Sequence, residues 1–281
     1  MAIVIAEAGK NFITSEKDES VYQEATNLVD FAKEAGADIV KFQTHRFDEI
    51  KMRDRSRRKW IERNIRLTPF AEFWLPLKEY CDSVGIEFLS TPMSLNAAKM
   101  IDVLVKRWKI GSGNIGDYPL LEFVAGTGKP VILSSGMSTL KELEKGLSII
   151  KTINPNCDLT LLHCVSEYPC PEEHANLSLI QKYKEMFGIR VGYSDHTMSL
   201  IIPALAVVHG AEVIEKHFTI DKDYWGPDHK ISLDFREFRK MVENVRTAEV
   251  SIGTGEKVIS QEENRLRKIF RPSEYTVSTN V

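Results

Sequence analysis

The chain has 281 residues, 43% hydrophobic and 27% charged, a composition typical of one folded globule. Its formal net charge of -3 and sequence pI of about 6.2 give no indication of a nucleic-acid partner. No apolar run approaches the roughly 18 residues that span a bilayer, and the apolar N-terminus reaches Glu7 too early for a signal peptide.

Short apolar runs, each followed by a helical pattern, recur along the chain. We predict strands at residues 2–8, 38–44, 87–91, 108–111, 130–135, 159–165, 190–193 and 212–218. We predict helices at 21–35, 70–84, 94–104, 119–125, 139–152, 177–187, 200–208 and 233–247. The strands are nearly continuous in apolar residues, as parallel strands buried on both faces should be.

Eight strand–helix units in about 250 residues predict an α/β fold of the (β/α)8 TIM-barrel type, which we assign to residues 1–270. A doubly wound open sheet is the weaker alternative, because neither GxGxxG nor a P-loop follows the first strand. Residues 271–281 have no helical period and are interpreted as a C-terminal tail or linker. The four cysteines lack CxxC spacing and indicate reduced thiols, so we expect a cytoplasmic protein.

Two segments do not follow the strand–helix pattern. Residues 47–65 are rich in Lys and Arg and form either a solvated loop or helix face, or a lid over an anionic substrate. The loop after the eighth strand contains Tyr224, Trp225 and Asp228. Asp228 either starts the next helix through an Asx-turn or folds back onto substrate hydroxyls, with the two aromatic residues excluding water.

Active sites of TIM barrels lie at the carboxyl ends of the strands, so polar residues there are candidates. The strands end with Glu7, Lys41, Gln43, Ser90, Thr91, Lys109, Ser112, Ser134, Ser135, His163, Ser166, Tyr168, Ser194, Asp195, His196, Glu215 and His217. A serine on a strand can be a bonded core hydroxyl. A buried lysine without a partner costs several kcal/mol, so Lys41 and Lys109 indicate a bound anion.

The serines and the backbone N–H groups of SGN and SGM would complete a phosphate or carboxylate cradle with these lysines. His196 and His217 end neighbouring strands and either share one cation or are separately satisfied. The remaining ligands of such a cation would be oxygens from water, substrate or Glu215. This ligand set suits Mn²⁺, Mg²⁺, Fe²⁺ or Zn²⁺.

Ten motifs in this order resemble the N-acetylneuraminate synthase family: IAEAGKN, GADIVKFQTH, FLSTP, KIGSG, LSSGM, LHCVSEYPCP, NLSLI, GYSDHT, EKHFTID and GPDHKISLD. The match runs from about residue 2 to residue 270. The resemblance implies a TIM barrel, a homodimer, and a metal-dependent condensation of phosphoenolpyruvate with a sugar aldehyde. The product would be a sialic-acid-like 2-keto-3-deoxy acid. The expected cofactor is a divalent metal, with Mn²⁺ expected in preference to Mg²⁺, Fe²⁺ or Zn²⁺.

By the same resemblance, Lys41, Lys109, Ser112, Ser134, Ser166 and Ser194 would hold phosphoenolpyruvate. His196 and His217 would bind the metal, and Gln43, Asn114, Tyr168 and Asp228 would contact the sugar. Glu215 lies where the family keeps an acidic residue near the metal. We therefore expect Glu215, Lys41 and Lys109 to be catalytic.

The sequence departs from the family pattern at three places. Asn11 is followed by Phe12 and Ile13 rather than by the His of an NHxG motif, and Asn114 stands where members have Glu. The chain ends at Val281, where typical members begin an antifreeze-like domain that completes the dimer. The remaining alternatives are a metal-dependent aldolase on the same barrel and a non-catalytic barrel that binds a metabolite.

Overall fold

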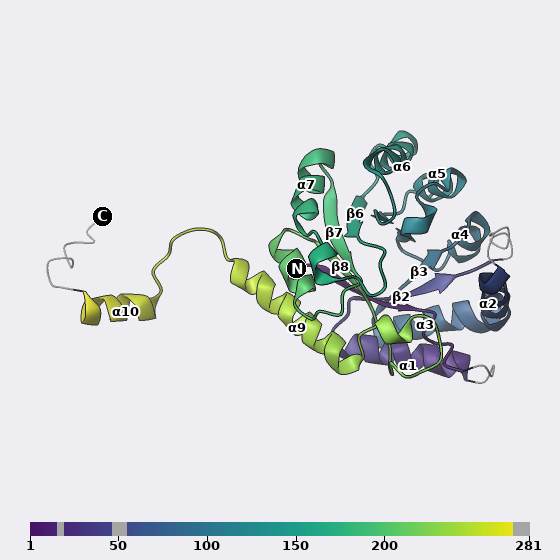
Figure 1. Ribbon diagram of the computed structural model, residues 1–281, viewed down its shortest axis with the longest axis horizontal. Coiled ribbons are helices and arrows are strands. Elements are labelled where there is room, and N and C mark those ends of the chain that lie inside the picture. The colour runs from purple at the N-terminus through teal and green to yellow at the C-terminus, as the bar shows by residue number, and fades with distance from the viewer. Residues whose placement is uncertain (16–19, 47–54, 272–281) are drawn as a thin grey trace.

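The computed structural model describes residues 1–15, 20–46 and 55–271. Figure 1 shows strands grouped around a common axis, with helices outside them. The strands are β1 (Ile3–Gly9), β2 (Ile39–Thr44), β3 (Glu87–Pro92), β4 (Trp108–Ile110), β5 (Val131–Ser134), β6 (Leu159–Cys164), β7 (Arg190–Asp195) and β8 (Val213–His217). The α-helices are α1 (Val21–Glu34), α2 (Arg55–Leu67), α3 (Leu75–Val84), α4 (Leu95–Ile101), α5 (Tyr118–Gly126), α6 (Leu140–Ile153), α7 (Ser178–Phe187), α8 (Ile202–Val208), α9 (Phe235–Ile252) and α10 (Gln261–Phe270). Short helical turns are η2 (Phe70–Trp74), η3 (Ser112–Asn114), η4 (Glu172–His174) and η5 (His229–Ile231).

The strands form one parallel sheet in the order β3-β2-β1-β8-β7-β6-β5-β4. Its two end strands, β3 and β4, have Cα atoms within 8 Å of each other, so the sheet curves into a nearly closed barrel. The order places the first and last strands side by side, as a (β/α)8 barrel requires. The predicted TIM-barrel fold is confirmed.

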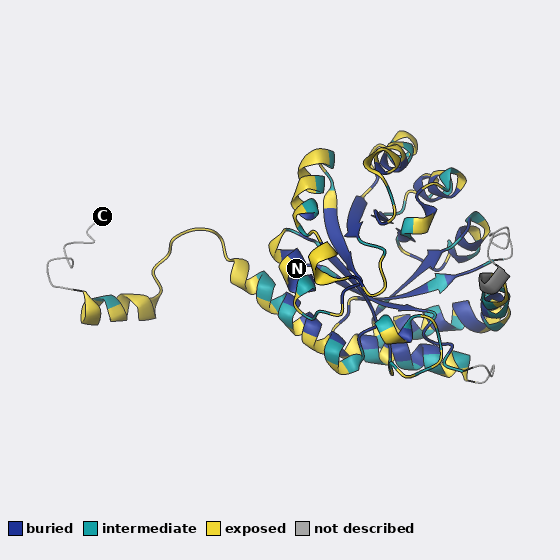
Figure 2. Cartoon of the chain, in the orientation of Figure 1, coloured by how far each residue is buried: buried dark blue, intermediate teal, exposed yellow. Residues whose placement is uncertain are grey.

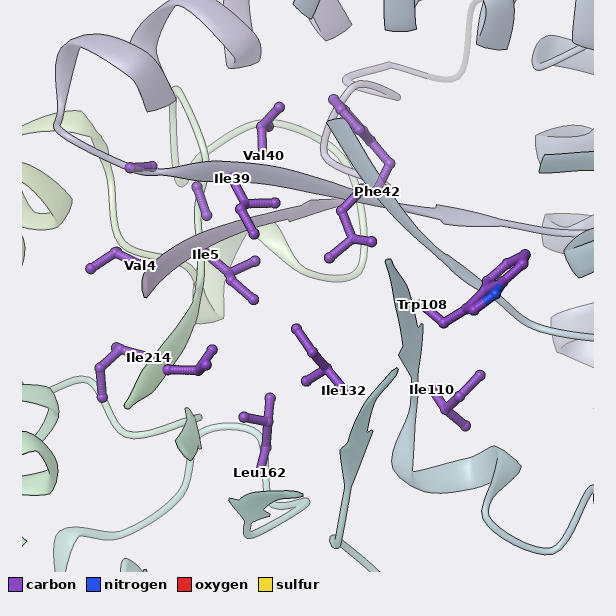
Figure 3. Packing of buried hydrophobic residues seen from close by; sticks show 14 of the residues in the cluster. Val4, Ile5, Ile39, Val40, Phe42, Trp108, Ile110, Ile132, Leu162 and Ile214 are labelled. Carbon is purple, nitrogen blue, oxygen red and sulfur yellow. The ribbon is translucent and has the colours of Figure 1, made fainter. Parts of the chain in front are cut away.

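The barrel interior is apolar in its lower layers. Figure 2 shows the strands as buried, and Figure 3 shows side chains from several strands filling the space between them. Ile5, Ile39, Ile132 and Leu162 are all at most 3% exposed. On β7 a Cβ added to Gly192 would overlap the Val213 carbonyl oxygen and come within 2.6 Å of Leu162 Cδ2. Only glycine therefore fits at that point of the wall.

Local sequence signals begin two of the long outer helices. In α6 the Thr139 side chain accepts from the Glu142 N–H while the Glu142 carboxylate accepts from the Thr139 N–H, and Asp234 and Glu237 form the same capping box in α9. No described helix combines the length and the apolar character needed to cross a membrane. Helix α10 stands apart from the barrel in Figure 1 and has no buried residue.

The region predicted as a basic insertion is partly helical. Helix α2 carries the Arg- and Lys-rich stretch from residue 55 onward, and Ile61 and Ile65 on it are buried. Residues 47–54, with Lys51 and Arg53, lie outside the described part of the chain, as does most of the predicted tail, residues 272–281. The helix-face interpretation is therefore confirmed for residues 58–65, and the lid stays a prediction.

Candidate active site

A cavity of about 880 Å³ opens at the carboxyl ends of the strands. Loops and strand ends from around the barrel contribute to its wall. The described residues that line it are Glu7, Lys41, Gln43, Thr91, Met93, Ser94, Leu95, Lys109, Gly111, Ser112, Gly113, Asn114, Asp117, Ser134, Met137, Cys164, Tyr168, Ser194, His196, Glu215 and His217. Most of the polar residues predicted at strand ends therefore share one cavity.

Strand geometry explains why these side chains converge. Side chains alternate between the two faces of a strand, so a polar residue two positions after a core residue points into the barrel one layer higher. Glu7 follows Ile5 in this way, and Lys41 follows Ile39. The same spacing places Ser134 above Ile132 on β5. The apolar layers thus lie directly beneath a polar layer at the carboxyl ends of the strands.

Two lysines and two glutamates form a buried ionic cluster in this polar layer. Lys41 forms an ion pair with Glu7, and its ammonium lies 3.6 Å from Glu215. Lys109 lies 3.4 Å from Glu215 and donates a 2.7 Å hydrogen bond to Ser134 Oγ. Ser194 donates to Glu215 at 3.0 Å. The lysines, which the sequence left without a partner, are therefore paired with carboxylates in the folded chain.

Burial and charge shift the four pKa values in different directions. Burial raises the pKa of Glu7, despite its ion pair with Lys41. For Glu215 burial is outweighed by Lys109 and Lys41, which lower its pKa to about 2. Burial lowers the pKa of Lys109, whereas Glu215 and Glu7 overcome burial and raise that of Lys41. Glu215 is thus the firmly ionised carboxylate, and it faces both ammonium groups, an arrangement that can still accept an anion.

Small side chains converge on the backbone of Gly136 beside this cluster. A Cβ added there would overlap Ser166 Oγ, approach Ser112 Oγ to 2.7 Å and approach Cys164 Sγ to 3.0 Å. Cys164 also contacts Ser112 and Ser166, at 3.6 and 3.9 Å. Hydroxyl groups, a close backbone and Lys109 together make a cradle for an oxyanion.

Substituting Gly136 with Ala is expected to raise the KM for an anionic substrate by roughly 10- to 100-fold, because the new methyl group forces the two hydroxyls out of the cradle. Steady-state kinetics on the purified variant measure this. Gly116→Ala is the matched control, because nothing lies within 4 Å of its Cβ position. Equal KM values for the two variants would show that Gly136 does not border the anion site.

The two imidazoles lie together at the carboxyl ends of β7 and β8. The ring centroids of His196 and His217 are 5.6 Å apart, and the Tyr168 ring lies 4.3 Å from that of His196. His196 Nδ1 lies 2.7 Å from the Val165 carbonyl oxygen, a contact that fixes its N–H and leaves Nε2 with a free lone pair. The buried Nδ1 of His217 has no hydrogen-bond partner. Burial lowers the pKa of His217 to about 3, so it is neutral at physiological pH.

These residues fit a divalent cation that completes its coordination with oxygen. The neutral imidazole of His217 and the Nε2 atom of His196 offer nitrogen ligands, and the unpaired Nδ1 of His217 is a buried polar atom in need of a partner. Among the described residues no group of three His, Cys, Asp or Glu could hold a metal ion. Glu215 is occupied by Lys41, Lys109 and Ser194, so water and substrate oxygens would have to supply the other ligands.

A third group of polar residues surrounds Gly9. A Cβ built on Gly9 would lie 3.2 Å from Glu7 Oε1, 3.4 Å from Gln43 Nε2 and 3.5 Å from Asp228 Oδ2. Gln43 donates a 2.8 Å hydrogen bond to Glu7. The Asp228 side chain caps no helix. Its carboxylate thus lies beside Glu7 and Gln43, which favours the fold-back interpretation over the Asx-turn.

Two of the residues predicted to bind substrate do not line the cavity itself. Ser166 and Asp228 are not among the described residues that line it, although Ser166 borders Gly136 and Asp228 lies near Gly9. Trp225 is 41% exposed and packs on Trp60 and Arg63 of α2, so it lies at the rim rather than in the wall. His163 is buried elsewhere, and its Nε2 lies 2.8 Å from the Ala175 carbonyl oxygen.

Sequence reasoning gave no role to several residues of the site. Glu7 stood at a strand end without a function, and Cys164 was read only as a reduced thiol. The period-two pattern that placed Lys41 in the barrel also places Glu7 there, two residues after Ile5, but only the structure shows that the two are register partners on β1 and β2. Met93 and Met137 come from loops and Leu95 from the first residue of α4, where no strand pattern applies.

Two of the three departures from the family pattern, the one at Asn11 and Phe12 and the one at Asn114, have structural roles. Asn11 donates hydrogen bonds to the Phe218 carbonyl oxygen and to Ser232 Oγ, at 2.8 and 3.0 Å, and so joins the loops after β1 and β8. Phe12 is fully buried, 5.1 Å from the ring of Phe73. Asn114 lines the cavity and donates to the Met93 carbonyl oxygen at 3.2 Å.

The chain is similar in sequence and fold to several known proteins. The model of the NeuB family matches residues 28–257. The N,N'-diacetyllegionaminic acid synthase of Legionella pneumophila is 38% identical over 285 residues, covering 96% of this chain and 78% of that protein. The human N-acetylneuraminate-9-phosphate synthase is 34% identical over 263 residues, covering 89% and 71%. The crystal structure of the sialic acid synthetase from Leptospira borgpetersenii superposes with a TM-score of 0.84 at 34% identity, covering 96% and 92%.

Proposed function

The chain belongs to the NeuB family, an enzyme family of sialic-acid-like synthases, and on this premise we propose that it condenses phosphoenolpyruvate with a sugar aldehyde in a metal-dependent reaction. The products are a 2-keto-3-deoxy sugar acid and phosphate. The observation that supports this most is the meeting of two buried lysines and two imidazoles in one cavity. A cavity of this kind can hold an anion and a carbonyl group together.

The cradle around Gly136 and the ionic cluster receive phosphoenolpyruvate. Lys41 and Lys109 face its carboxylate and phosphate, and the hydroxyls of Ser112, Ser134, Ser166 and Ser194 hydrogen bond to its oxygens. Glu215 stays ionised because its pKa is about 2, so it acts by holding both ammonium groups in place rather than by moving a proton. Charged groups that are fixed in position before the substrate binds make the largest catalytic contribution that such a buried site offers.

The aldehyde occupies the half of the cavity that contains the imidazoles. His196 and His217 would hold the divalent metal, Mn²⁺ in preference to other ions, and when bound it would supply Lewis acidity at the carbonyl oxygen. Gln43, Asn114, Tyr168 and Asp228 orient the sugar through its hydroxyl groups. Tyr168 packs against His196 with its ring tilted by 46°, which places its hydroxyl-bearing ring beside the imidazoles.

Carbon–carbon bond formation follows from this placement. C3 of phosphoenolpyruvate attacks the aldehyde carbon, one water molecule adds at C2, and the tetrahedral adduct loses phosphate to leave the 2-keto group. Lys41 and Lys109 stabilise negative charge on the phosphate from binding to departure. The hydroxyl side chains keep their hydrogen bonds to the leaving group throughout.

Phosphate release in the presence of Mn²⁺, phosphoenolpyruvate and a panel of N-acyl and unsubstituted aldohexoses tests this function. Release is expected to require the aldehyde and the metal together, and to stop with EDTA. If pyruvate supports faster carbon–carbon bond formation than phosphoenolpyruvate, the aldolase alternative holds. Tight binding of phosphoenolpyruvate without turnover on any aldose would leave the non-catalytic alternative.

A further inference from the structure

A second ion pair lies directly behind the two imidazoles, outside the cavity. Asp195 on β7 and Lys216 on β8 are each 1% exposed. They are register partners across the two parallel strands, one step beyond the pair Ser194 and Glu215. Because side chains alternate between strand faces, Ser194 and Glu215 point into the barrel and Asp195 and Lys216 point to its outer side.

The Lys216 ammonium contacts both sequence neighbours of His196. It lies 2.5 Å from Asp195 Oδ2 and also donates to the Thr197 carbonyl oxygen. Asp195 in turn accepts from Thr197, at 2.9 Å from its N–H and 3.1 Å from its hydroxyl. Lys216 itself immediately precedes His217. One ammonium therefore ties the segment that carries the first imidazole to the residue next to the second.

Packing alone does not require charges at this position. Removing an ammonium and a carboxylate from water is costly, and an apolar pair of similar volume would hold the two strands together at least as well. The ion pair adds directional contacts that an apolar pair lacks. A lysine held between a carboxylate and a carbonyl oxygen fixes the backbone on both sides of His196. The separation of the imidazoles depends on that backbone.

We propose that Asp195 and Lys216 are positioning residues that set the distance between His196 and His217 and thereby the affinity of the cation site. This inference rests on the proposed function, since it assumes that the two imidazoles bind a metal. It assigns a role to a buried pair that touches neither substrate.

The test is the Mn²⁺ dissociation constant of the metal-free full chain, measured by electron paramagnetic resonance. Lys216→Met is expected to weaken Mn²⁺ binding by roughly 10- to 100-fold, as changes behind metal ligands generally do. Calorimetric binding of phosphoenolpyruvate without metal should change less than about twofold, because the residues of the cradle are untouched. A general loss of structure would move both values.

Two further variants keep the test decisive. Asp195→Asn preserves size and the bond that the Thr197 N–H donates to Oδ1, so it replaces Lys216→Met if that protein does not fold. Lys129→Met is the control, because Lys129 forms an ion pair with Asp102 at the amino ends of the strands. It should leave Mn²⁺ affinity unchanged.

The outcomes separate the two proposals. If the unsubstituted protein binds Mn²⁺ and both Lys216→Met and Asp195→Asn bind it equally well, the positioning role is wrong and the metal site stands. If the unsubstituted protein binds phosphoenolpyruvate but no Mn²⁺, the metal-dependent function fails and the positioning role fails with it.

Discussion

Replacing Lys109 with Met is expected to lower kcat/KM for phosphoenolpyruvate on the order of 10³-fold, because the cavity loses one of the two buried cations that we propose hold the phosphate and carboxylate. The protein should still fold. Glu215 keeps Lys41 at 3.6 Å and the hydrogen bond from Ser194 at 3.0 Å, so no carboxylate is left buried without a partner. Steady-state phosphate release at saturating aldehyde measures the loss.

Lys129→Met is again the matched control. This variant carries the same Lys-to-Met change just before β5, where the lysine pairs with Asp102 outside the cavity. Its kcat/KM should stay within about twofold of the unsubstituted value, since surface ion pairs contribute little. If Lys109→Met kept a tenth or more of the activity while folding normally, the anion would have to bind elsewhere.

Substituting His217 with Asn should abolish Mn²⁺ binding and lower turnover on the order of 10³-fold, because a Lewis acid contributes several kcal/mol and each 1.36 kcal/mol is a factor of ten. Among the described residues no group of three His, Cys, Asp or Glu could hold a metal, so the proposed site depends on both imidazoles. Turnover and Mn²⁺ binding are measured on the same preparation.

His163→Asn serves as the control for this substitution. His163 is also a buried histidine on a barrel strand, but it bonds to the Ala175 carbonyl oxygen and does not line the cavity. This variant should keep its Mn²⁺ affinity. Full turnover of His217→Asn, or of the unsubstituted protein in EDTA, would show that the imidazoles have another purpose.

The barrel and much of its mouth could be predicted because they depend on short periodicities. An apolar strand of period two that ends in Lys, Ser or His places those side chains in one layer, whichever strand carries them. Lys41, Lys109, Ser134, His196 and His217 follow this rule. Capping boxes such as Thr139 with Glu142 are equally local and mark helix starts directly.

The partners of those residues could not be predicted. Whether Lys41 faces an anion or a carboxylate depends on the register of β1 and β8 against β2 and β7, and no local pattern encodes register in a parallel sheet. For the same reason the sequence patterns assign no role to Lys216, although it lies between Glu215 and His217 in the motif EKHFTID. A charged residue between two inward-facing ones is the signal that marks it.

Loop residues follow a different rule. The position of Asp228 near Gly9 depends on a bridge between the loops after β1 and β8, in which Asn11 bonds to Phe218 and Ser232. The departure at Phe12 looked like a lost functional motif, yet the side chain fills an aromatic cluster with Phe42 and Phe73. Such roles come from contacts distant in sequence, which single-sequence patterns do not contain.

The central claim is that one cavity joins C3 of phosphoenolpyruvate to an aldehyde carbon. Carbon-13 NMR of the products formed from phosphoenolpyruvate labelled at C3, with Mn²⁺ and an accepted aldose, tests it most directly. The account predicts that the label appears as a methylene carbon bonded to the former aldehyde carbon. Label recovered only in the methyl group of pyruvate, with phosphate released and no new carbon–carbon bond, would contradict it.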